Sequence, residues 1–305
     1  MSMAGSNTTS AMATATASAD GHEGAEVATN DQTHEATKSG GEDAELAAKL
    51  DGWRYEQQAL RARLSLKDDN NDGDAMASWT YFGGVDVSFV KGTDQACASL
   101  VVLHSSNSDS PAQELKVVYE DFALVTMDEP YVAGFLAFRE VKFLKALWQR
   151  LEARIAEKRP DEQNLRLPEV VLVDGNGIMH PEGFGLASHL GVELDVRTVG
   201  VAKTFLHVDG ITKDVMAAQL AATPRAASGF TATRLVGASK RCWGCAVLPL
   251  ASLSKPIFVS QGHRVSLETA LEVVRRCSAY RIPEPVRQAD LRSREWLRNH
   301  DVQMP

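Results

Sequence analysis

Three acidic residues lie in apolar surroundings, where a lone carboxylate is costly. Asp86 interrupts the stretch "YFGGVDVSFV", residues 81–90, in which apolar residues alternate at the two-residue period of a strand. Glu140 lies in the middle of the apolar stripe of a helix predicted over 134–158. Asp174 directly follows the apolar run "VVLV". Because burying an unpaired carboxylate costs several kcal/mol, each of these acids needs a cation or hydrogen bonds.

Taken singly, each acid has an ordinary structural explanation. A buried salt bridge can hold Glu140, and an aspartate such as Asp174, before "GNG", commonly begins a tight turn. If the three carboxylates converge, their repulsion raises their pKa values unless a cation is present. Hard oxygen ligands suit Mg²⁺ or Mn²⁺, which can also bridge a phosphate. Together the acids therefore predict a divalent-metal site for phosphate chemistry.

The elements that must position these acids follow a diagnostic order. Strand patterns over 82–90, 96–104 and 115–125 predict an antiparallel meander, and the helix over 134–158 and a doubly buried strand over 170–173 come next. This order indicates an α/β protein of ribonuclease H-like fold, with three antiparallel strands followed by parallel strands in a mixed sheet and helices on both faces. A doubly wound fold would begin with βαβ. In a ribonuclease H-like sheet the three acids meet at one end.

The remaining elements are assigned from weaker patterns. The sequence predicts further helices over 43–66, 182–190, 266–278 and 286–299, further strands over 195–201, 244–250 and 256–260, and a weakly patterned insertion over 205–240.

Charge is distributed unevenly along the 305 residues. The first 50 residues are rich in Ser, Thr and Ala, carry 8 Asp and Glu against 2 Lys and Arg, and predict a disordered tail over 1–45. Residues 201–305 carry 15 Lys and Arg against 8 Asp and Glu. A nucleic-acid or phosphate ligand is therefore permitted despite the net charge of −8, although an ordinary basic surface has the same composition.

The same composition argues against several classes of protein. No apolar run reaches membrane-spanning length, and the N-terminal segment has the features of neither a signal peptide nor a transit peptide, so no membrane partner is expected. Four scattered cysteines do not form a secreted disulfide framework and favour a reducing compartment. A cytoplasmic or nuclear, including nucleolar, location is therefore the expectation. "CWGC", residues 242–245, lacks a second Cys/His pair at zinc-site spacing, which favours incidental packing or a minor redox sensitivity.

Several blocks, in register along the chain, resemble the endonuclease V family. They are "GGVDVSFVKG", "PYVAGFLAFREV", "VVLVDGNGIMHPEGFGLASHLGV", "VGVAKTFL" and "SQGHRVSLETA", and the closing "RIPEPVRQADLRSRE" resembles its animal-type members. The resemblance implies a ribonuclease H-like fold and hydrolysis that depends on Mg²⁺, for which Mn²⁺ can substitute. The implied cut lies at the second phosphodiester 3′ to inosine and leaves 3′-hydroxyl and 5′-phosphate ends. The resulting division is a tail over 1–45, a helix and polar linker over 46–78 and a catalytic domain over 79–300.

The resemblance also implies a role for each matching residue of the active site. Asp86 and Asp174 would ligate the metal, and Glu140 would complete the acidic set directly or through water. His263 in "GHRVSLE" resembles the family's active-site histidine, near a second metal or the attacking water. Lys203 in "GVAK" would contact the scissile phosphate.

Two further motifs resemble the parts of the family that handle the base. Gly175, Gly177 and His180 would line a pocket for the everted hypoxanthine, where glycines permit close backbone approach. Pro130 and Tyr131 match the strand-separating wedge. Bacterial members read Pro-Tyr-Ile-Pro here, so "PYVAG" lacks the second proline that would stiffen a duplex-opening wedge.

The choice of substrate follows from the animal-type blocks, which imply a preference for single-stranded, inosine-containing RNA. Repair of deoxyinosine in DNA is the alternative activity, and a non-catalytic inosine- or nucleic-acid-binding protein is the alternative of another class. A nucleotide-binding module that uses "DGNG" as a phosphate loop lacks GxGxxG or a Walker lysine. The sequence predicts no oligomeric state.

Overall fold

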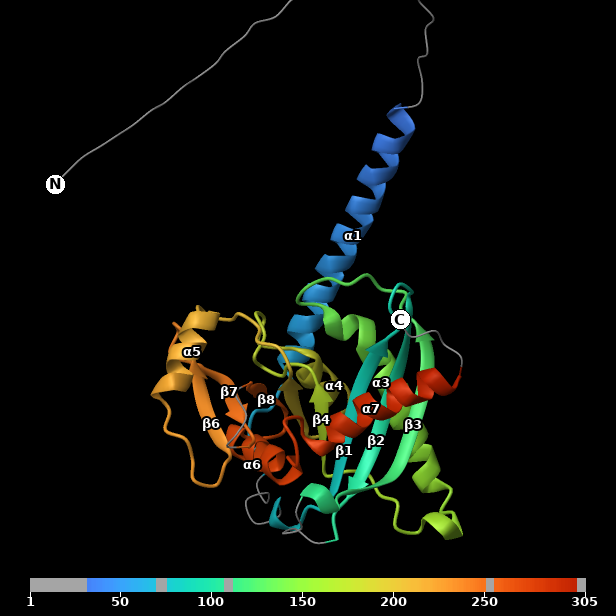
Figure 1. The fold of residues 1–305 in the computed structure, drawn as a ribbon. Coiled ribbons are helices and arrows are strands. Elements are labelled where there is room, and N and C mark those ends of the chain that lie inside the picture. Colours follow the sequence, from blue (N-terminus) through green and yellow to red (C-terminus); the bar gives the residue numbers. More distant parts are fainter. Residues whose placement is uncertain (1–31, 70–75, 107–111, 251–254, 301–305) are drawn as a thin grey trace, which may run out of the picture. The chain divides into compact units, whose positions relative to one another are not determined.

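The computed structural model describes residues 32–69, 76–106, 112–250 and 255–300 (Figure 1). The chain divides into two units, Met1–Ala48 and Lys49–Pro305. Residues 1–31 of the predicted acidic tail lie outside the described residues. The rest of that predicted tail, residues 32–45, is helical, because helix α1 (Gln32–Arg61) begins well before the predicted helix start.

The second unit is built on one mixed sheet whose strands lie in the order β3-β2-β1-β4-β5-β8-β7-β6 (Figure 1). The first three strands pair antiparallel, and β4 and β5 add in parallel beside β1. The other three strands continue the sheet antiparallel. The predicted mixed α/β sheet of ribonuclease H-like order is therefore confirmed. The strands are β1 (Tyr81–Phe89), β2 (Gln95–His104), β3 (Lys116–Thr126), β4 (Val170–Asp174), β5 (Thr198–Ala202), β6 (Thr231–Val236), β7 (Cys242–Leu248) and β8 (Ile257–His263).

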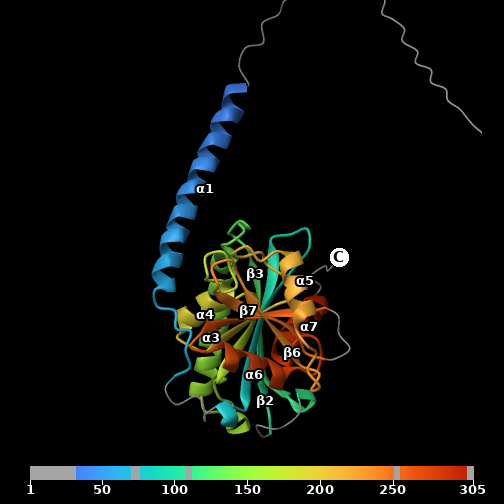
Figure 2. The ribbon, with the colours of Figure 1, turned by 90° about the vertical axis from the view of Figure 1, so that its left-hand side faces the viewer.

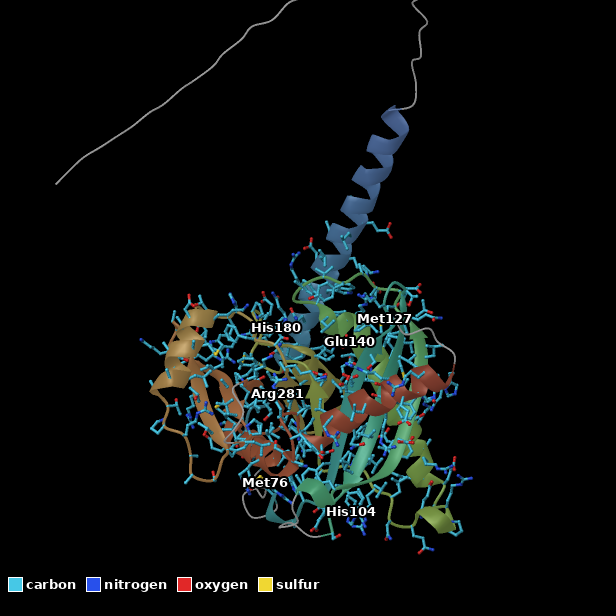
Figure 3. The ribbon with its side chains drawn as sticks, in the orientation of Figure 1. Met76, His104, Met127, Glu140, His180 and Arg281 are labelled. Carbon is cyan, nitrogen blue, oxygen red and sulfur yellow. The ribbon has the colours of Figure 1, made fainter. Side chains whose placement is uncertain are left out.

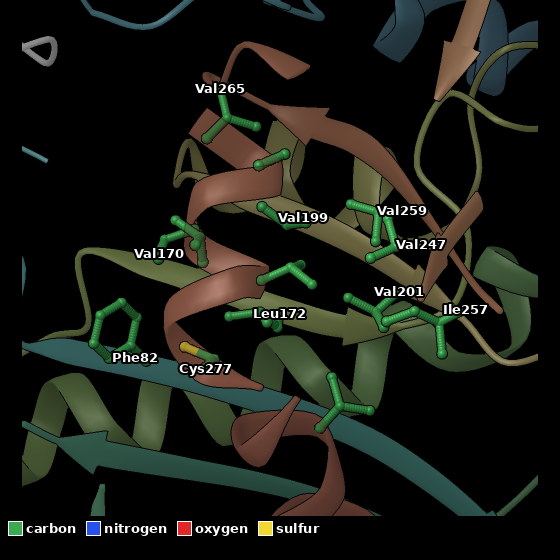
Figure 4. Packing of buried hydrophobic residues seen from close by; sticks show 14 of the residues in the cluster. Phe82, Val170, Leu172, Val199, Val201, Val247, Ile257, Val259, Val265 and Cys277 are labelled. Carbon is green, nitrogen blue, oxygen red and sulfur yellow. The ribbon is translucent and has the colours of Figure 1, made fainter. Parts of the chain in front are cut away.

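Helices cover both faces of this sheet, as predicted (Figures 1 and 2). Strand β4 shows why its sequence is apolar throughout. Val171 and Val173 pack in the cluster with α3 and α4, whereas Val170 and Leu172 pack in the cluster with α6 (Figure 4). The helices of the second unit are α3 (Leu136–Ala156), α4 (Leu186–Leu194), α5 (Lys213–Ala222), α6 (Leu267–Cys277) and α7 (Glu284–Asn299). Within the described residues, no helix has the length and apolar character needed to cross a bilayer.

The segment predicted as a weakly patterned insertion over 205–240 contains helix α5 and strand β6, neither of which was predicted. Residue Thr212 caps the start of α5 with its side chain, and β6 pairs with β7 as the edge strand of the sheet. Strand β6 alternates buried and half-buried or exposed side chains, as expected for a strand covered on one face only. Because this segment is rich in Ala and Thr, its hydrophobic periodicity is too weak to indicate a helix or a strand.

The N-terminal end of α7 lies directly against β1. A Cβ atom on Gly84 would lie 2.0 Å from the carbonyl oxygen of Pro285, so only glycine permits this approach. Further along the helix, the hydroxyl oxygens of Ser88 and Ser293 lie 2.8 Å apart, and the hydroxyl of Ser99 donates to the carbonyl oxygen of Ala289. These contacts fix α7 across the strand that carries Asp86.

The part of α1 in the second unit, and the chain after it, pack on that unit. Trp53, Gln57 and Leu60 recur at helical spacing and are all buried. After the helix, Asp69 forms ion pairs with Arg197 and Arg264. The region predicted as a helix and polar linker over 46–78 therefore supplies buried contacts to the fold.

Candidate active site

Two of the predicted metal ligands lie side by side at the carboxyl ends of parallel strands. Val85 of β1 pairs with Val173 of β4, so the next residues, Asp86 and Asp174, occupy equivalent places on neighbouring strands. Asp86 is only 7% exposed. Burial, together with the hydrogen bond and the charge of Asp174, raises the pKa of Asp86 to about 8. The carboxylate that interrupts the strand pattern is thus held beside a second acid.

Glu140 reaches the same group from α3, as its place on the apolar stripe predicts (Figure 3). It is 4% exposed. Burial raises its pKa to about 8, and the charges of Asp86 and Asp174 act in the same direction. The three acids therefore lie close enough to influence one another, although they come from two strands and a helix.

Lys203 follows β5 and supplies the positive charge of this group. Its Nζ lies 2.5 Å from Oδ2 of Asp174 and 3.4 Å from Oδ2 of Asp290. Burial opposes the charge of Lys203, but the neighbouring carboxylates outweigh it and raise the pKa of the amine. The predicted phosphate-contacting lysine thus lies among the predicted metal ligands.

The structure adds Asp290 of α7, which the sequence reasoning missed. Asp290 lines the same pocket, of about 360 Å³, and its charge contributes to the raised pKa of Asp86. The signal was present in the sequence: Val286, Ala289 and Ser293 are buried on α7, so an acid at position 290 lies at the edge of the buried face. The pocket is lined by Asp86, Val87, Ser88, Phe89, Lys91, Asp174, Lys203, Asp290 and Arg294.

His263 is not part of this group, which corrects its predicted place near a second metal or the attacking water. Strand β8 runs antiparallel to β5, so His263 pairs with Thr198 at the start of β5, whereas Lys203 follows the end of β5. The Nδ1 of His263 accepts a hydrogen bond from the backbone N–H of Ser65, and its Nε2 lies 3.4 Å from Asp195. Burial lowers the pKa of His263 against the opposing effect of Asp195. Its contacts are those of a structural histidine.

The predicted base-handling loops lie together. The loop after β4 contains His180, whose Cε1 lies 4.0 Å from the position of a Cβ on Gly134, in the loop that carries Pro130 and Tyr131 (Figure 3). Tyr131 is 67% exposed, so its ring is free to stack on a base. Burial lowers the pKa of His180 to about 4, and its Nδ1 accepts from the backbone N–H of Glu182. His180 is therefore a neutral imidazole at physiological pH.

The two predicted pocket glycines differ in what they can contribute. Gly175 is half-buried next to Asp174, and its N–H donates to Val201. Gly177 is buried, with its N–H donating to Ser260 Oγ and its carbonyl accepting from Gly185. Its role is to let the loop lie on β8, because a Cβ there would be 1.9 Å from a carbonyl oxygen. On the described part of this loop, the buried side-chain oxygen of Asn176 has no hydrogen-bond partner.

Helix α1 braces both base-handling loops, which the sequence reasoning also missed. The side-chain amide nitrogen of Gln57 donates to the carbonyl oxygens of Gly134 and Phe184, at 3.3 and 3.2 Å. The ring of Trp53 stacks on that of Phe138, with centroids 5.2 Å apart. The spacing of Trp53 and Gln57 would have indicated a buried helix face.

Two groups of side chains have the donor types of a metal site. The carboxylates of Asp86, Asp174, Glu140 and Asp290 fit a hard divalent cation, since the raised pKa values of Asp86 and Glu140 express a repulsion that such a cation relieves. The ligand atoms of Glu56, His189 and Glu193 also lie within 4.8 Å of one another. There, however, Glu56 is exposed, and hydrogen bonds from His189 and Lys145 lower the pKa of Glu193 to about 2, so no repulsion between buried carboxylates calls for a cation. The first group is the candidate centre for phosphate chemistry.

Comparison with known proteins identifies relatives over most of the chain. Residues 58–291 match the family model described as Endonuclease V. The chain is 46% identical to endonuclease V of Mus musculus over 249 residues, which cover 81% of this chain and 69% of the mouse protein. It is 43% identical to endonuclease V of Homo sapiens over 250 residues, which cover 81% of this chain and 82% of the human protein.

Solved structures agree with this match. The catalytic domain of human endonuclease V superposes with a TM-score of 0.74 at 42% identity, covering 83% of this chain and 97% of that chain. Ciona intestinalis endonuclease V, in complex with a 24mer DNA containing an inosine followed by a ribo-adenosine, has a TM-score of 0.70 at 32% identity and covers 84% of this chain and 100% of that chain.

Proposed function

Because the chain belongs to the endonuclease V family, we propose that it is a Mg²⁺-dependent endonuclease that cuts single-stranded RNA at the second phosphodiester 3′ to inosine. The observation that carries the proposal is the gathering of Asp86, Asp174 and Asp290 with Lys203 in one pocket, and the buried Glu140 lies close enough for the charges of Asp86 and Asp174 to act on it. Lys203 pairs with Asp174 and Asp290, and Arg294 pairs with Asp290. The pKa values of Asp86 and Glu140 nevertheless stay raised, so the cations of the pocket do not balance its carboxylates.

Asp86, Glu140, Asp174 and Asp290 would hold the cation, and Mn²⁺ would substitute for Mg²⁺ because both prefer oxygen ligands. When bound, the metal activates water and offsets the charge that builds on the phosphate. Hydrolysis adds water across the P–O3′ bond: the oxygen of water joins the phosphorus, and the 3′-oxygen leaves with a proton. Lys203, held by Asp174 and Asp290, neutralises a non-bridging phosphate oxygen during this step.

The base is held by the two loops that α1 braces. Hypoxanthine presents an N1–H donor and an O6 acceptor, and the free carboxamide of Asn176 can serve both. The neutral ring of His180 adds no charge to this pocket, which suits an uncharged base. The exposed ring of Tyr131 stacks in the gap that the everted base leaves, a contact worth about 1–3 kcal/mol.

The preference for RNA rests on where the cut lies. Cleavage at the second phosphodiester makes the 3′-oxygen of the nucleotide after inosine the leaving group, so the neighbouring 2′-hydroxyl is next to the reacting bond. The Ciona relative is in complex with a 24mer DNA containing an inosine followed by a ribo-adenosine, which supports a requirement for ribose at this position. The missing second proline in "PYVAG" supports single-stranded substrates.

One set of oligonucleotides tests the proposal. Inosine strands made entirely of RNA, entirely of DNA, and of DNA with one ribose directly after inosine are cut in Mg²⁺ and in Mn²⁺. We expect the all-RNA and single-ribose strands to be cut at similar rates and the all-DNA strand far more slowly. Guanosine in place of inosine should abolish cutting in every strand. Equal rates on all-DNA and all-RNA strands would replace the RNA assignment by deoxyinosine repair in DNA. Inosine-dependent binding without cleavage in either metal would indicate a non-catalytic inosine-binding protein.

A further inference from the structure

Two arginine side chains meet over Gly183, at the far end of the loop that follows β4. Gly183 has a φ of +63°, a conformation that favours glycine. Nη2 of Arg61 and Nη1 of Arg241 each lie 3.6 Å from the point where a Cβ atom of residue 183 would be. The same point lies 3.6 Å from Cζ3 of Trp243, so the space that the missing side chain leaves is bounded by both guanidinium groups and an indole ring. Two guanidinium groups therefore face one small space above the loop.

The charges of these arginines are not balanced locally. Among the residues that the structure describes, neither Arg61 nor Arg241 forms an ion pair with a carboxylate, and this includes the exposed Glu182 beside Gly183. Asp209, the acid that acts on Arg241 from nearby, instead accepts hydrogen bonds from Trp243 Nε1 and Ser239 Oγ. Two like charges held together in this way are relieved by an anion.

Both arginines are anchored by packing. The guanidinium carbon of Arg241 lies 4.3 Å from the ring centroid of Trp243. Arg61 is the last residue of α1, next to Leu60, which packs on Phe184. Anchoring reduces the entropy that is lost when a ligand is bound. Guanidinium groups also match phosphate oxygens better than ammonium groups do, because their donors form a planar fork.

The position of Arg61 and Arg241 relative to the sheet indicates which phosphate of the substrate they contact. The acidic pocket lies at β1 and β4, and the loop after β4 extends towards β7, since Met179 Cε would lie 2.8 Å from a Cβ on Gly244 of that strand. Arg241 directly precedes β7. The loop that holds the base thus separates the arginine pair from the carboxylates. If the carboxylates cut on the 3′ side of inosine, the arginines face the 5′ side.

We propose that Arg61 and Arg241 form a binding site for a backbone phosphate of the substrate strand on the 5′ side of inosine. The site extends the proposed function and rests on it for the strand direction. Arg61 and Arg241 would hold the strand beyond the base pocket. The inosine base would then lie in its pocket while the scissile phosphate lies at the carboxylates.

Binding of fluorescently labelled single-stranded RNA, with Ca²⁺ in place of Mg²⁺ to keep the strand intact, tests the site. Arg61→Gln and Arg241→Gln should each weaken binding about tenfold, as expected for one charge-assisted hydrogen bond. Each should also make the salt dependence of binding less steep, by about 0.7 in the logarithmic slope for each lost contact with a single strand. The losses should be equal for inosine and guanosine strands. Arg159→Gln, at an exposed arginine beyond the end of α3 that carries no such site, is the matched control. Binding and salt slopes unchanged from the parent protein would overturn the proposal.

Neutral methylphosphonate linkages, placed one at a time along the strand, identify the phosphate. A linkage 5′ to inosine should weaken binding of the parent protein but cause no further loss in the double variant R61Q/R241Q, because the same contact is already absent. The assignment would be overturned if every 5′ linkage weakened binding of the double variant as much as that of the parent protein. It would also be overturned if only linkages on the 3′ side lost their effect in the double variant. If the parent protein does not distinguish inosine from guanosine, the proposed function fails, whereas the salt slopes still report on the arginine pair.

Discussion

Nζ of Lys203 lies 2.5 Å from Oδ2 of Asp174, so the acidic pocket contains its own cation. Lys203 and Arg294, which pairs with Asp290, face the carboxylates of Asp86, Asp174 and Asp290. Burial and the mutual repulsion of the acids still raise the pKa values of Asp86 and Glu140. The cations of the pocket therefore do not balance its carboxylates, and the effect of this charge imbalance on stability can be measured.

Metal-free protein should lose stability as the pH rises. The pKa of Asp86 is raised to about 8 from 3.8, so its contribution to stability is fully present below pH 4 and is lost as the pH rises through 8. Glu140 acts in the same direction. In EDTA, the melting temperature should therefore fall between pH 5 and pH 8, and Asp86→Asn should reduce that fall and abolish cleavage. Adding Mg²⁺ should restore stability to the parent protein more than to the variant.

The control for this prediction is Glu295→Gln, which neutralises an exposed acid on α7. It should keep the pH dependence of the melting temperature unchanged. A parent protein whose metal-free melting temperature rises steadily from pH 5 to pH 8 would contradict the charge imbalance.

We expect Asp290, and not His263, to contribute to catalysis. Asp290→Asn removes a carboxylate 3.4 Å from Lys203 and should lower turnover by about 10- to 100-fold, the range expected for residues that support a metal site. His263→Ala should keep turnover close to that of the parent protein. Because His263 accepts a hydrogen bond from the Ser65 N–H, its loss should instead lower the free energy of unfolding by about 1–3 kcal/mol. Single-turnover rates and denaturant unfolding separate the two effects, and the reverse pattern would restore His263 to the active site.

Gln57 should act on substrate binding through the loops that it joins. Gln57→Leu leaves the carbonyl oxygens of Gly134 and Phe184 without their side-chain donor, which costs about 1–3 kcal/mol and loosens both base-handling loops. We expect KM for inosine RNA to rise more than kcat falls, since the acidic pocket is not touched. The neighbouring Gln58 is exposed, so Gln58→Leu is the matched control and should leave KM unchanged. Equal effects of the two substitutions would show that the brace has no functional role.

His180 should make the protein sensitive to acid. Its pKa is lowered to about 4 from 6.5 by burial, so the neutral ring contributes stability that is present above pH 6.5 and is lost as the pH falls through 4. His180→Asn removes this titration, and its melting temperature should vary less between pH 6.5 and pH 4 than that of the parent protein. Calorimetry at several pH values measures the difference. Identical pH profiles for the two proteins would show that folding does not lower the pKa of His180.

The sequence by itself determined the local features of this protein. The two-residue period around Asp86, the apolar stripe around Glu140 and the apolar run before Asp174 each place an acid on a known face of a known element. These patterns persist in the structure because burial on a strand or helix depends mainly on nearby residues. The order of the elements then sufficed to predict the mixed sheet.

Only the tertiary structure decided which distant elements share a face. His263 follows a strand pattern as plainly as Lys203 does, but the antiparallel direction of β8 places it at the opposite end of β5. Asp290 enters the pocket because Gly84 lets α7 approach β1, and Gln57 reaches two loops that lie far from it in the chain. Strand direction and helix docking depend on contacts between residues distant in sequence, and periodicity within one element carries no information about them.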